Sequence, residues 1–231
     1  MSNSKYLQPK KYFDFFLKKI KNVFFTLENG GERVDMVFTS PLLLSDNEKC
    51  HLKRYQFASS HIESGETVGD FACGTGYGSV ILAQKAKSVV GADIDKRVIA
   101  NITQKYHTIK NLSFKEADLL KLNFKEEFDC IVSFETIEHF VEDDINTVLT
   151  IFNTSLKKGG RLILSTPYMQ KKDKNSLRFH KTFCIDEQKI TTLLFQHGFT
   201  NPVFFYQSYS WPAISKANVT KEFIICIAQK S

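Results

Sequence analysis

From Thr67 onward, short apolar segments alternate with amphipathic ones, and this alternation constrains the fold more than any other feature of the chain. Short apolar strands separated by amphipathic helices are typical of a parallel sheet with helices on both faces. The alternation therefore predicts an α/β fold. The strand candidates cover 67–71, 88–93, 111–116, 129–134 and 161–166, and the helix candidates between them cover 78–87, 96–106 and 143–156.

The C-terminal part breaks the alternation. A helix is expected over 186–197, and Gly198 ends it because glycine readily leaves the helical conformation. Two strand-like runs follow, at 202–209 and 221–229, with Trp211-Pro212 in the turn region between them. They predict a closing antiparallel hairpin.

The N-terminal part is expected to be helical and irregular in turn. Residues 9–24 carry Phe13, Phe16, Leu17, Ile20 and Phe24 at helical spacing among lysines, which predicts an amphipathic basic helix. This helix packs on the domain, or lies over a substrate or a membrane surface. A further helix is expected over 47–63, capped by Asp46 or Asn47. We therefore divide the chain into an N-terminal extension, 1–46, and one domain, 47–231.

Composition excludes several broad classes. Of the 231 residues, 42% are hydrophobic and 24% are charged, which excludes wholesale disorder. The net charge of +6 is compatible with an anionic partner without establishing one. No apolar run reaches the length of a membrane span, and we recognise no secretory signal. The five cysteines form neither a disulfide framework nor a metal-binding pair, so we expect a cytoplasmic protein with reduced thiols.

A glycine-rich segment after the first strand identifies the class of ligand. It runs from Asp70 through Gly74, Gly76 and Gly78 and opens the next helix. Dinucleotide-binding chains need G-x-G-x-x-G, and phosphate-binding loops need Gly-Lys-Ser/Thr; neither pattern is present here. A carboxylate beside a helix N-terminus repels a pyrophosphate but suits a ligand with an ammonium group. The segment therefore favours a cationic ligand.

This segment and four more occur at the distances expected for one known family. Over residues 47–199 the sequence resembles the class I S-adenosylmethionine (SAM)-dependent methyltransferases. The other segments are 89–93, 116–119, 128–135 and 156–162. The resemblance implies a SAM-dependent methyltransferase (EC 2.1.1.-). It also implies a Rossmann-like, seven-stranded, mostly parallel sheet with helices on both faces, a C-terminal antiparallel hairpin and a helical N-terminal extension. One departure is Gly69, where the family usually has a bulky apolar residue.

The resemblance also assigns cofactor-binding roles. Asp93 would hold the ribose hydroxyls, with Asp95 as a rival, and Asp118 would face the adenine amine, unless it only caps a helix. Asp70 would contact the ligand or only fix the glycine loop. The full set of cofactor-binding candidates is Asp70, Gly74, Gly76, Asp93, Asp118, Leu119, Ser133, Arg54 and Tyr55.

Glu135, Glu138 and His139 follow the fourth strand at i, i+3 and i+4, so one helical face can present all three. This cluster resembles the ubiquinone-pathway O-methyltransferases and the small-RNA 3′-terminal 2′-O-methyltransferases. In both groups such residues hold a divalent ion, and His180 would be the fourth ligand here. Oxygen and imidazole ligands suit Mg, Mn, Fe or Zn. Three interpretations stay open: a metal site, His139 as a metal-free general base, or Glu135 near the SAM methionine with His139 structural.

The acceptor is predicted from two further segments. Residues 51–58 and 165–180 are similar to those of bacterial-type methyltransferases that act on sugars or glycan precursors. Five basic residues of the loop 167–182 would grip a phosphate-bearing sugar or an RNA, or would simply face solvent; they are Lys171, Lys172, Lys174, Arg178 and Lys181. We therefore expect O-methylation of a sugar hydroxyl or a similar small polar acceptor, with Glu135 and His139 as catalytic residues. There are two alternatives. The protein could instead methylate RNA at a 2′-oxygen, although the sequence contains no RNA-binding module, or it could be a non-catalytic SAM-binding regulatory module.

Overall fold

The computed structural model describes residues 44–172, 179–216 and 220–231. The predicted helix 9–24 lies outside these residues, so the N-terminal extension stays a prediction. The elements follow in the order α2 (Asp46–Ser60), β1 (Thr67–Phe71), α3 (Tyr77–Ala83), β2 (Ser88–Asp93), α4 (Lys96–Lys105), β3 (Leu112–Glu116), η2 (Leu119–Lys121), β4 (Phe128–Phe134), η3 (Ile137–His139), α5 (Glu142–Ser155), β5 (Leu156–Pro167), α6 (Glu187–Gln196), β6 (Phe199–Gln207) and β7 (Phe223–Lys230).

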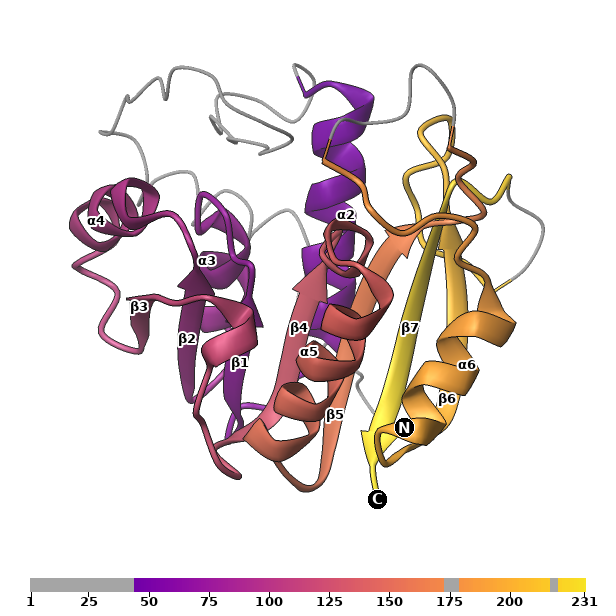
Figure 1. Cartoon of the computed structure of the whole chain (residues 1–231). Coiled ribbons are helices and arrows are strands. Elements are labelled where there is room, and N and C mark those ends of the chain that lie inside the picture. Colours follow the sequence, from indigo (N-terminus) through magenta and orange to yellow (C-terminus); the bar gives the residue numbers. More distant parts are fainter. Residues whose placement is uncertain (1–43, 173–178, 217–219) are drawn as a thin grey trace, which may run out of the picture.

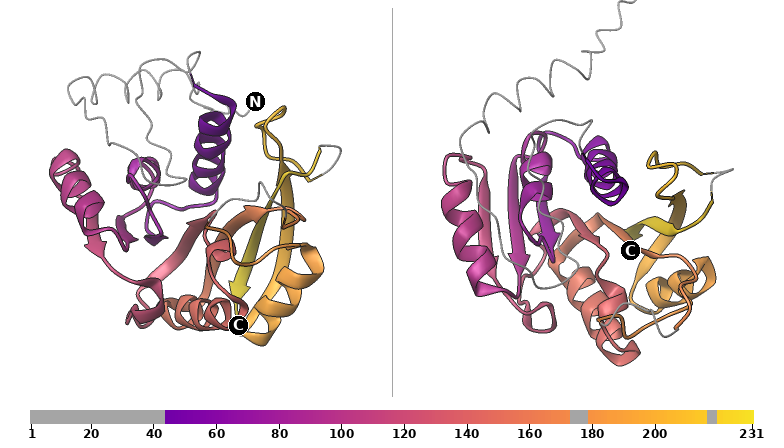
Figure 2. Two further views of the ribbon diagram at one scale, coloured as in Figure 1. Left: turned by 45° about the horizontal axis from the view of Figure 1, so that its top comes forward. Right: turned by 90° about the horizontal axis from the view of Figure 1, so that it is seen from above.

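The strands form one seven-stranded sheet in the order β3-β2-β1-β4-β5-β7-β6 (Figure 1). Strands β1 to β5 run parallel, while β7 pairs antiparallel with both β5 and β6. Helices α5 and α6 cover one face of the sheet, and α2, α3 and α4 lie on the other (Figure 2). The predicted α/β fold, with its Rossmann-like sheet and C-terminal antiparallel strands, is confirmed.

Phenylalanine rings fill much of the core between the sheet and α5. The Phe71 ring lies 5.4 Å from that of Phe128 and 5.5 Å from that of Phe152, and all three side chains are fully buried. Gly69 makes this packing possible, because a Cβ atom there would stand 2.9 Å from the Phe71 ring. The unusual glycine in β1 is therefore explained by the bulk of Phe71, which lies on the same face of the strand two residues later.

Helix α2 begins with a capping box. Ser45 accepts a hydrogen bond from the backbone amide of Glu48, and the Glu48 carboxylate accepts one from the Ser45 amide. Two of the amides that a helix leaves unpaired at its start are thereby satisfied. The prediction of Asp46 or Asn47 as the cap was wrong by one or two residues, although the Ser-x-x-Glu pattern was present in the sequence.

The largest boundary error concerns β5. It begins at Leu156, ahead of the strand predicted over 161–166. The register against β4 shifts between Phe128 and Cys130, and Gly159 takes a positive φ of 73°. The strand therefore continues through the glycines by means of an irregularity.

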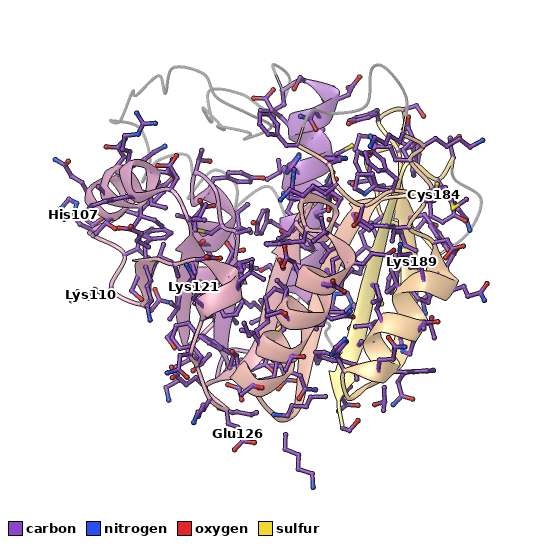
Figure 3. All side chains as sticks on the ribbon, in the orientation of Figure 1. His107, Lys110, Lys121, Glu126, Cys184 and Lys189 are labelled. Atoms are coloured by element: carbon purple, nitrogen blue, oxygen red, sulfur yellow. The ribbon has the colours of Figure 1, made fainter. Side chains whose placement is uncertain are left out.

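All five cysteines are free thiols; Cys184 is exposed, on the outer surface near α6 (Figure 3), and the other four are buried. Among the residues described, no helix is long and apolar enough to cross a membrane.

Replacement of Phe152 tests the aromatic core. Phe152→Ala should lower the free energy of unfolding by about 3–5 kcal/mol, because it removes a fully buried ring and leaves a cavity. Phe195→Ala, at a position in α6 that is 56% exposed, should change it by less than about 0.5 kcal/mol. Urea unfolding of both variants measures the difference. Equal effects would contradict this assignment of the core.

Candidate functional site

A cavity of about 620 Å³ opens at the carboxyl ends of the parallel strands. In the sheet order, β1 separates β2 and β3 on one side from β4 on the other, and ligands of open α/β sheets bind where the strand order reverses in this way. The cavity is lined by His51, Tyr55, Ala72, Cys73, Gly74, Thr75, Tyr77, Asp93, Ile94, Asp95, Ala117, Asp118, Leu119, Phe134, Glu135, Thr136, His139, Phe140, Phe179 and Lys181.

The cavity has two halves of different composition. The loops after β1, β2 and β3 line one half with the glycine segment and with Asp93, Asp95 and Asp118. Helix α2, the segment after β4, Phe179 and Lys181 line the other half with aromatic rings, the imidazoles of His51 and His139, and one lysine. Of the predicted cofactor-binding residues, the lining includes Gly74, Asp93, Asp118, Leu119 and Tyr55.

Asp70 lies beneath the glycine loop, outside the lining of the cavity. Its fully buried carboxylate accepts hydrogen bonds from Tyr55 Oη at 3.1 Å and Ser79 Oγ at 2.5 Å. Burial raises the pKa of Asp70 to about 7, with a smaller increase from nearby Asp93, while the two hydrogen bonds act in the opposite direction. Asp70 therefore joins α2 to α3 under the loop, which corresponds to the loop-fixing alternative.

The glycine loop needs its glycines for two different reasons. Gly76 has a φ of 73°, and a Cβ atom there would stand 2.9 Å from the Phe114 ring. Gly78 lies directly under the Tyr55 ring, where a Cβ atom would stand 2.0 Å from the nearest ring atom. Close packing of α3 on α2 thus depends on Gly78.

Asp93 and Asp95 have different local partners. The Asp93 carboxylate accepts from the Gly74 amide at 2.9 Å and from the Asp95 amide at 3.0 Å, so it ties the end of β2 to the glycine loop. Asp95 is the N-cap of α4, where its Oδ1 accepts from the amides of Arg97 and Val98. Asp93 is thus the carboxylate at the strand end beside the loop, as the sequence suggested.

Asp118 and Ser133 also make local hydrogen bonds. Asp118 caps the short helix η2 by accepting from the Leu120 amide, and it lines the cavity as well, so the capping and binding interpretations are compatible. Ser133 is buried outside the cavity lining, and its hydroxyl donates to the Phe71 carbonyl at 2.9 Å. This bond holds the ends of β1 and β4 side by side.

Arg54 is fully buried and lies outside the cavity lining. Its Nε donates to Gln207 Oε1 at 2.8 Å, its Nη1 lies 2.9 Å from Glu135 Oε1, and its guanidinium stacks over the Phe223 ring at 4.4 Å. Sequence patterns did not indicate the partners Gln207 and Phe223, because they lie more than 150 residues further along the chain.

Glu135 lies in the cavity wall at the end of β4, in the left-handed region with a φ of 51°. The prediction that one helical face presents Glu135, Glu138 and His139 was wrong, because only the short helix η3, Ile137–His139, follows. The Glu135 side chain instead accepts from Ser165 Oγ at 2.7 Å and pairs with Arg54.

The structure does bring Glu138, His139 and His180 together, and their ligand atoms all lie within 4.8 Å of one another. Backbone bonds from Lys181 and Thr182 to the Glu138 carbonyl hold the loop that carries His180. Burial, followed by the charge of Glu135, raises the pKa of Glu138, and its buried Oε1 has no hydrogen-bond partner among the residues described. Glu135 is not a member of this group.

The other histidines differ in their surroundings. His51 lines the cavity from α2, one turn before Tyr55, and burial together with the charge of Arg54 lowers its pKa to about 3. It is therefore neutral at physiological pH. His107 lies at the outer end of α4 (Figure 3). His61 packs against Phe57, and His197 forms a hydrogen-bond contact with Asn146.

The basic residues predicted in the loop 167–182 are only partly described. Lys174 and Arg178 lie outside the described residues, whereas Lys181 lines the cavity.

Comparison with known proteins identifies the domain. Residues 68–160, from β1 to the first part of β5, match the family described as "Methyltransferase domain". This part of the chain is a class I SAM-dependent methyltransferase domain.

Among the curated relatives of this chain, a "Probable S-adenosylmethionine-dependent methyltransferase" of Mycolicibacterium smegmatis is 30% identical over 109 residues, which are 47% of this chain and 40% of the relative. A protein of the same description from Mycobacterium tuberculosis is 27% identical over 164 residues, 68% of this chain and 58% of the relative. The chain thus spans only about half the length of these relatives.

Among solved structures, N-methyltransferase NodS from Bradyrhizobium japonicum, in complex with S-adenosyl-L-homocysteine, superposes with a TM-score of 0.61 at 18% identity. The match covers 84% of this chain and 90% of NodS. At this level of identity the likeness shows the fold.

The buried Asp70 predicts a pH dependence of stability. With a native pKa of about 7 and an unfolded value of 3.8, Asp70 keeps a proton in the native state that the unfolded state loses. Its contribution to stability should therefore fall as the pH rises from about 4 to 7. Urea unfolding at pH 5 and pH 8 should show a smaller decline for Asp70→Asn than for the wild type. The exposed Asp143→Asn should keep the wild-type decline, and an unchanged decline in Asp70→Asn would contradict the prediction.

Proposed function

We propose that this protein transfers the methyl group of SAM to a hydroxyl oxygen of a sugar or of a similar small polar acceptor. The observation that carries the proposal is the division of one cavity into two halves. One half combines the glycine loop with carboxylates at successive strand ends, and the other combines aromatic rings with neutral and charged hydrogen-bonding groups. Methyl transfer requires donor and acceptor in line within one cavity, because orientation alone can supply about 7–11 kcal/mol.

On the donor side, we assign the ribose hydroxyls to Asp93 and the adenine amine to Asp118. A carboxylate has two oxygens with four lone-pair sites, so Asp93 can accept from a ribose while it holds the loop amides. Leu119 supplies an apolar wall beside Asp118. The glycine loop lets the backbone approach the ligand closely.

On the acceptor side, the aromatic residues favour the apolar face of a sugar ring and the polar residues favour its hydroxyls. Phe134, Phe140 and Phe179 supply apolar surface, whereas His51 supplies a neutral imidazole that accepts a hydrogen bond. His139 is the candidate general base, because an oxygen acceptor must lose a proton during transfer. Lys181 supports an acceptor that carries a phosphate, such as a nucleotide-sugar or a lipid-linked sugar.

As the alternative to His139 as the general base, we propose that Glu138, His139 and His180 form a divalent-metal site. The unpartnered Glu138 Oε1 and the two imidazoles are ligand types that such an ion takes, and their ligand atoms lie within 4.8 Å of one another. Nδ1 of His139 faces the Phe179 carbonyl and Nδ1 of His180 faces Gln170 Oε1, contacts that favour Nε2 as the ligand atom. A bound ion would act as a Lewis acid on an acceptor hydroxyl.

The acceptor class can be tested with methyl-labelled SAM and separate pools of UDP-hexoses, hexose 1-phosphates, lipids, RNA and protein. We expect label in the sugar pools. Asp93→Asn should weaken S-adenosylhomocysteine binding about 10- to 100-fold and reduce transfer accordingly, because charged hydrogen bonds to the ribose are lost. Asp143→Asn, at an exposed position of α5, is the matched control. Label in RNA alone would support the RNA alternative, and SAM binding without transfer would support a regulatory module.

The metal site can be tested by titration with Mn²⁺, followed by calorimetry. The wild type should bind Mn²⁺, and His180→Ala should weaken the binding by about tenfold or more, because it removes one of three protein ligands. His197→Ala, outside the group, should bind like the wild type. Methyl transfer that is unaffected by EDTA would contradict the metal site and leave His139 as a metal-free base.

A further inference from the structure

A lysine outside the cavity lies between two tyrosine rings and a carboxylate. Nζ of Lys221, two residues before β7, is 3.8 Å from the centre of the Tyr206 ring and 5.1 Å from that of the Tyr168 ring. It donates to Glu187 Oε1 at 2.9 Å, and the Tyr206 hydroxyl donates to the same oxygen. We call these four residues the clamp. They come from four separate segments of the chain.

The clamp is stronger than its ion pair alone. The side chains of Lys221 and Glu187 are 39% and 30% exposed, and an ion pair with such access to water contributes little by itself. The two rings shield the ammonium group and attract it through their faces. Although partial burial would raise the pKa of Glu187, the hydrogen bonds from Tyr206 and Lys221 lower it to about 2, so the carboxylate is charged at physiological pH.

The clamp joins the two ends of the segment between β5 and α6. Tyr168 directly follows β5, and Glu187 is the first residue of α6. Next to the clamp, two backbone hydrogen bonds of 2.9 Å connect residues 169–170 to residues 184–185. These four residues form a stem, and the clamp lies at its base.

The stem is strained on both sides. Met169 has a φ of 49° and Cys184 a φ of 54°, so each lies in the left-handed region. A residue with a Cβ atom stays in this conformation only where its surroundings impose it. The stem therefore needs contacts beyond its own two hydrogen bonds, and the clamp supplies them at its base.

Beyond the stem, the same segment reaches the acceptor half of the cavity. Phe179 and Lys181 line the cavity there. The amides of Lys181 and Thr182 donate to the Glu138 carbonyl at 2.8 Å and 3.1 Å, and Thr182 Oγ1 donates to the Phe140 carbonyl at 2.6 Å. The segment is thus held at the cavity wall by these bonds and at its base by the clamp, so release of the base would displace Phe179 and Lys181.

We propose that Lys221 is a positioning residue for the acceptor, because the clamp that it completes fixes the stem behind Phe179 and Lys181. This inference rests on the proposed function, since it takes these two residues to contact the acceptor. The clamp joins β6 and the starts of α6 and β7 to the end of β5, at the opposite end of the sheet from β2 and β3. The donor half of the cavity should therefore be independent of it.

The first test is limited trypsin digestion of the folded, full-length chain, followed by mass spectrometry. Cleavage after Lys181 requires the backbone there to leave the Glu138 carbonyl, so its rate reports release of the segment. Lys221→Met keeps a long side chain beside the rings but removes the charge. It should accelerate this cleavage about tenfold, because a hydrogen bond between charged groups is lost. Cleavage after Lys157, within β5, should keep its wild-type rate.

Two further variants are controls. Lys189→Met breaks the Lys189–Glu142 pair, which also involves α6 but lies outside the clamp, and should be cleaved after Lys181 like the wild type. Lys221→Arg keeps the charge and can still stack on the rings, so it should restore most of the protection that Lys221→Met loses.

The second test measures methyl transfer to the UDP-hexose or hexose 1-phosphate that accepts label from SAM. Lys221→Met should raise the KM for this acceptor about tenfold, because the residues that contact it are displaced. Binding of S-adenosylhomocysteine, measured by calorimetry, should change less than about twofold, since the donor half is lined by the loops after β1, β2 and β3.

An unchanged rate of cleavage after Lys181 in Lys221→Met would overturn the inference and leave the proposed function intact. Equal acceleration after Lys157 and Lys181 would give Lys221 a merely structural role, and an unchanged KM would remove its role toward the acceptor; either result also overturns the inference. If the wild type transferred label to none of the pools, the proposed function would fail, and the role of Lys221 in acceptor binding with it.

Discussion

The parallel pairing of β1 with β4 is the constraint on which the cavity depends. Val68 to Asp70 align with Cys130 to Val132, so both strands end at the same edge of the sheet. From this edge the glycine loop turns toward α3 on one face, while the chain after β4 leads to α5 on the other. The two loops diverge, and the space between them is the cavity.

Helix α2 closes this space at a considerable electrostatic cost. It buries Arg54 completely, and the pairing that offsets this burial comes from Glu135 after β4 and Gln207 at the end of β6. Tyr55, one residue further, connects the same helix to Asp70. The wall of the cavity thus joins four parts of the chain: α2, the end of β1, the segment after β4 and the end of β6.

Local patterns predicted most of the fold. The bounds of β1 and β2 were predicted to the residue, because apolar runs with clear polar flanks leave little freedom in where a buried strand starts and stops. The start of β5 was missed, since Lys157 to Gly160 have the composition of a turn, and only pairing with β4 and β7 extends the strand through them. The helical spacing of Glu135 and Glu138 was equally misleading, because the strand ends in a left-handed residue and not in a helix.

The sequence by itself determined the α/β architecture, the glycine loop and the family, because each depends on residues close together in the chain. The tertiary structure alone decided which charged groups reach the cavity. Asp70 and Arg54 look like ligand-binding residues in the sequence, but both are buried outside the cavity lining. Asp70 accepts from Tyr55 and Ser79, and Arg54 donates to Gln207 and pairs with Glu135. The reason is physical: a buried charge must find a partner, and the sequence does not reveal which distant residues supply it.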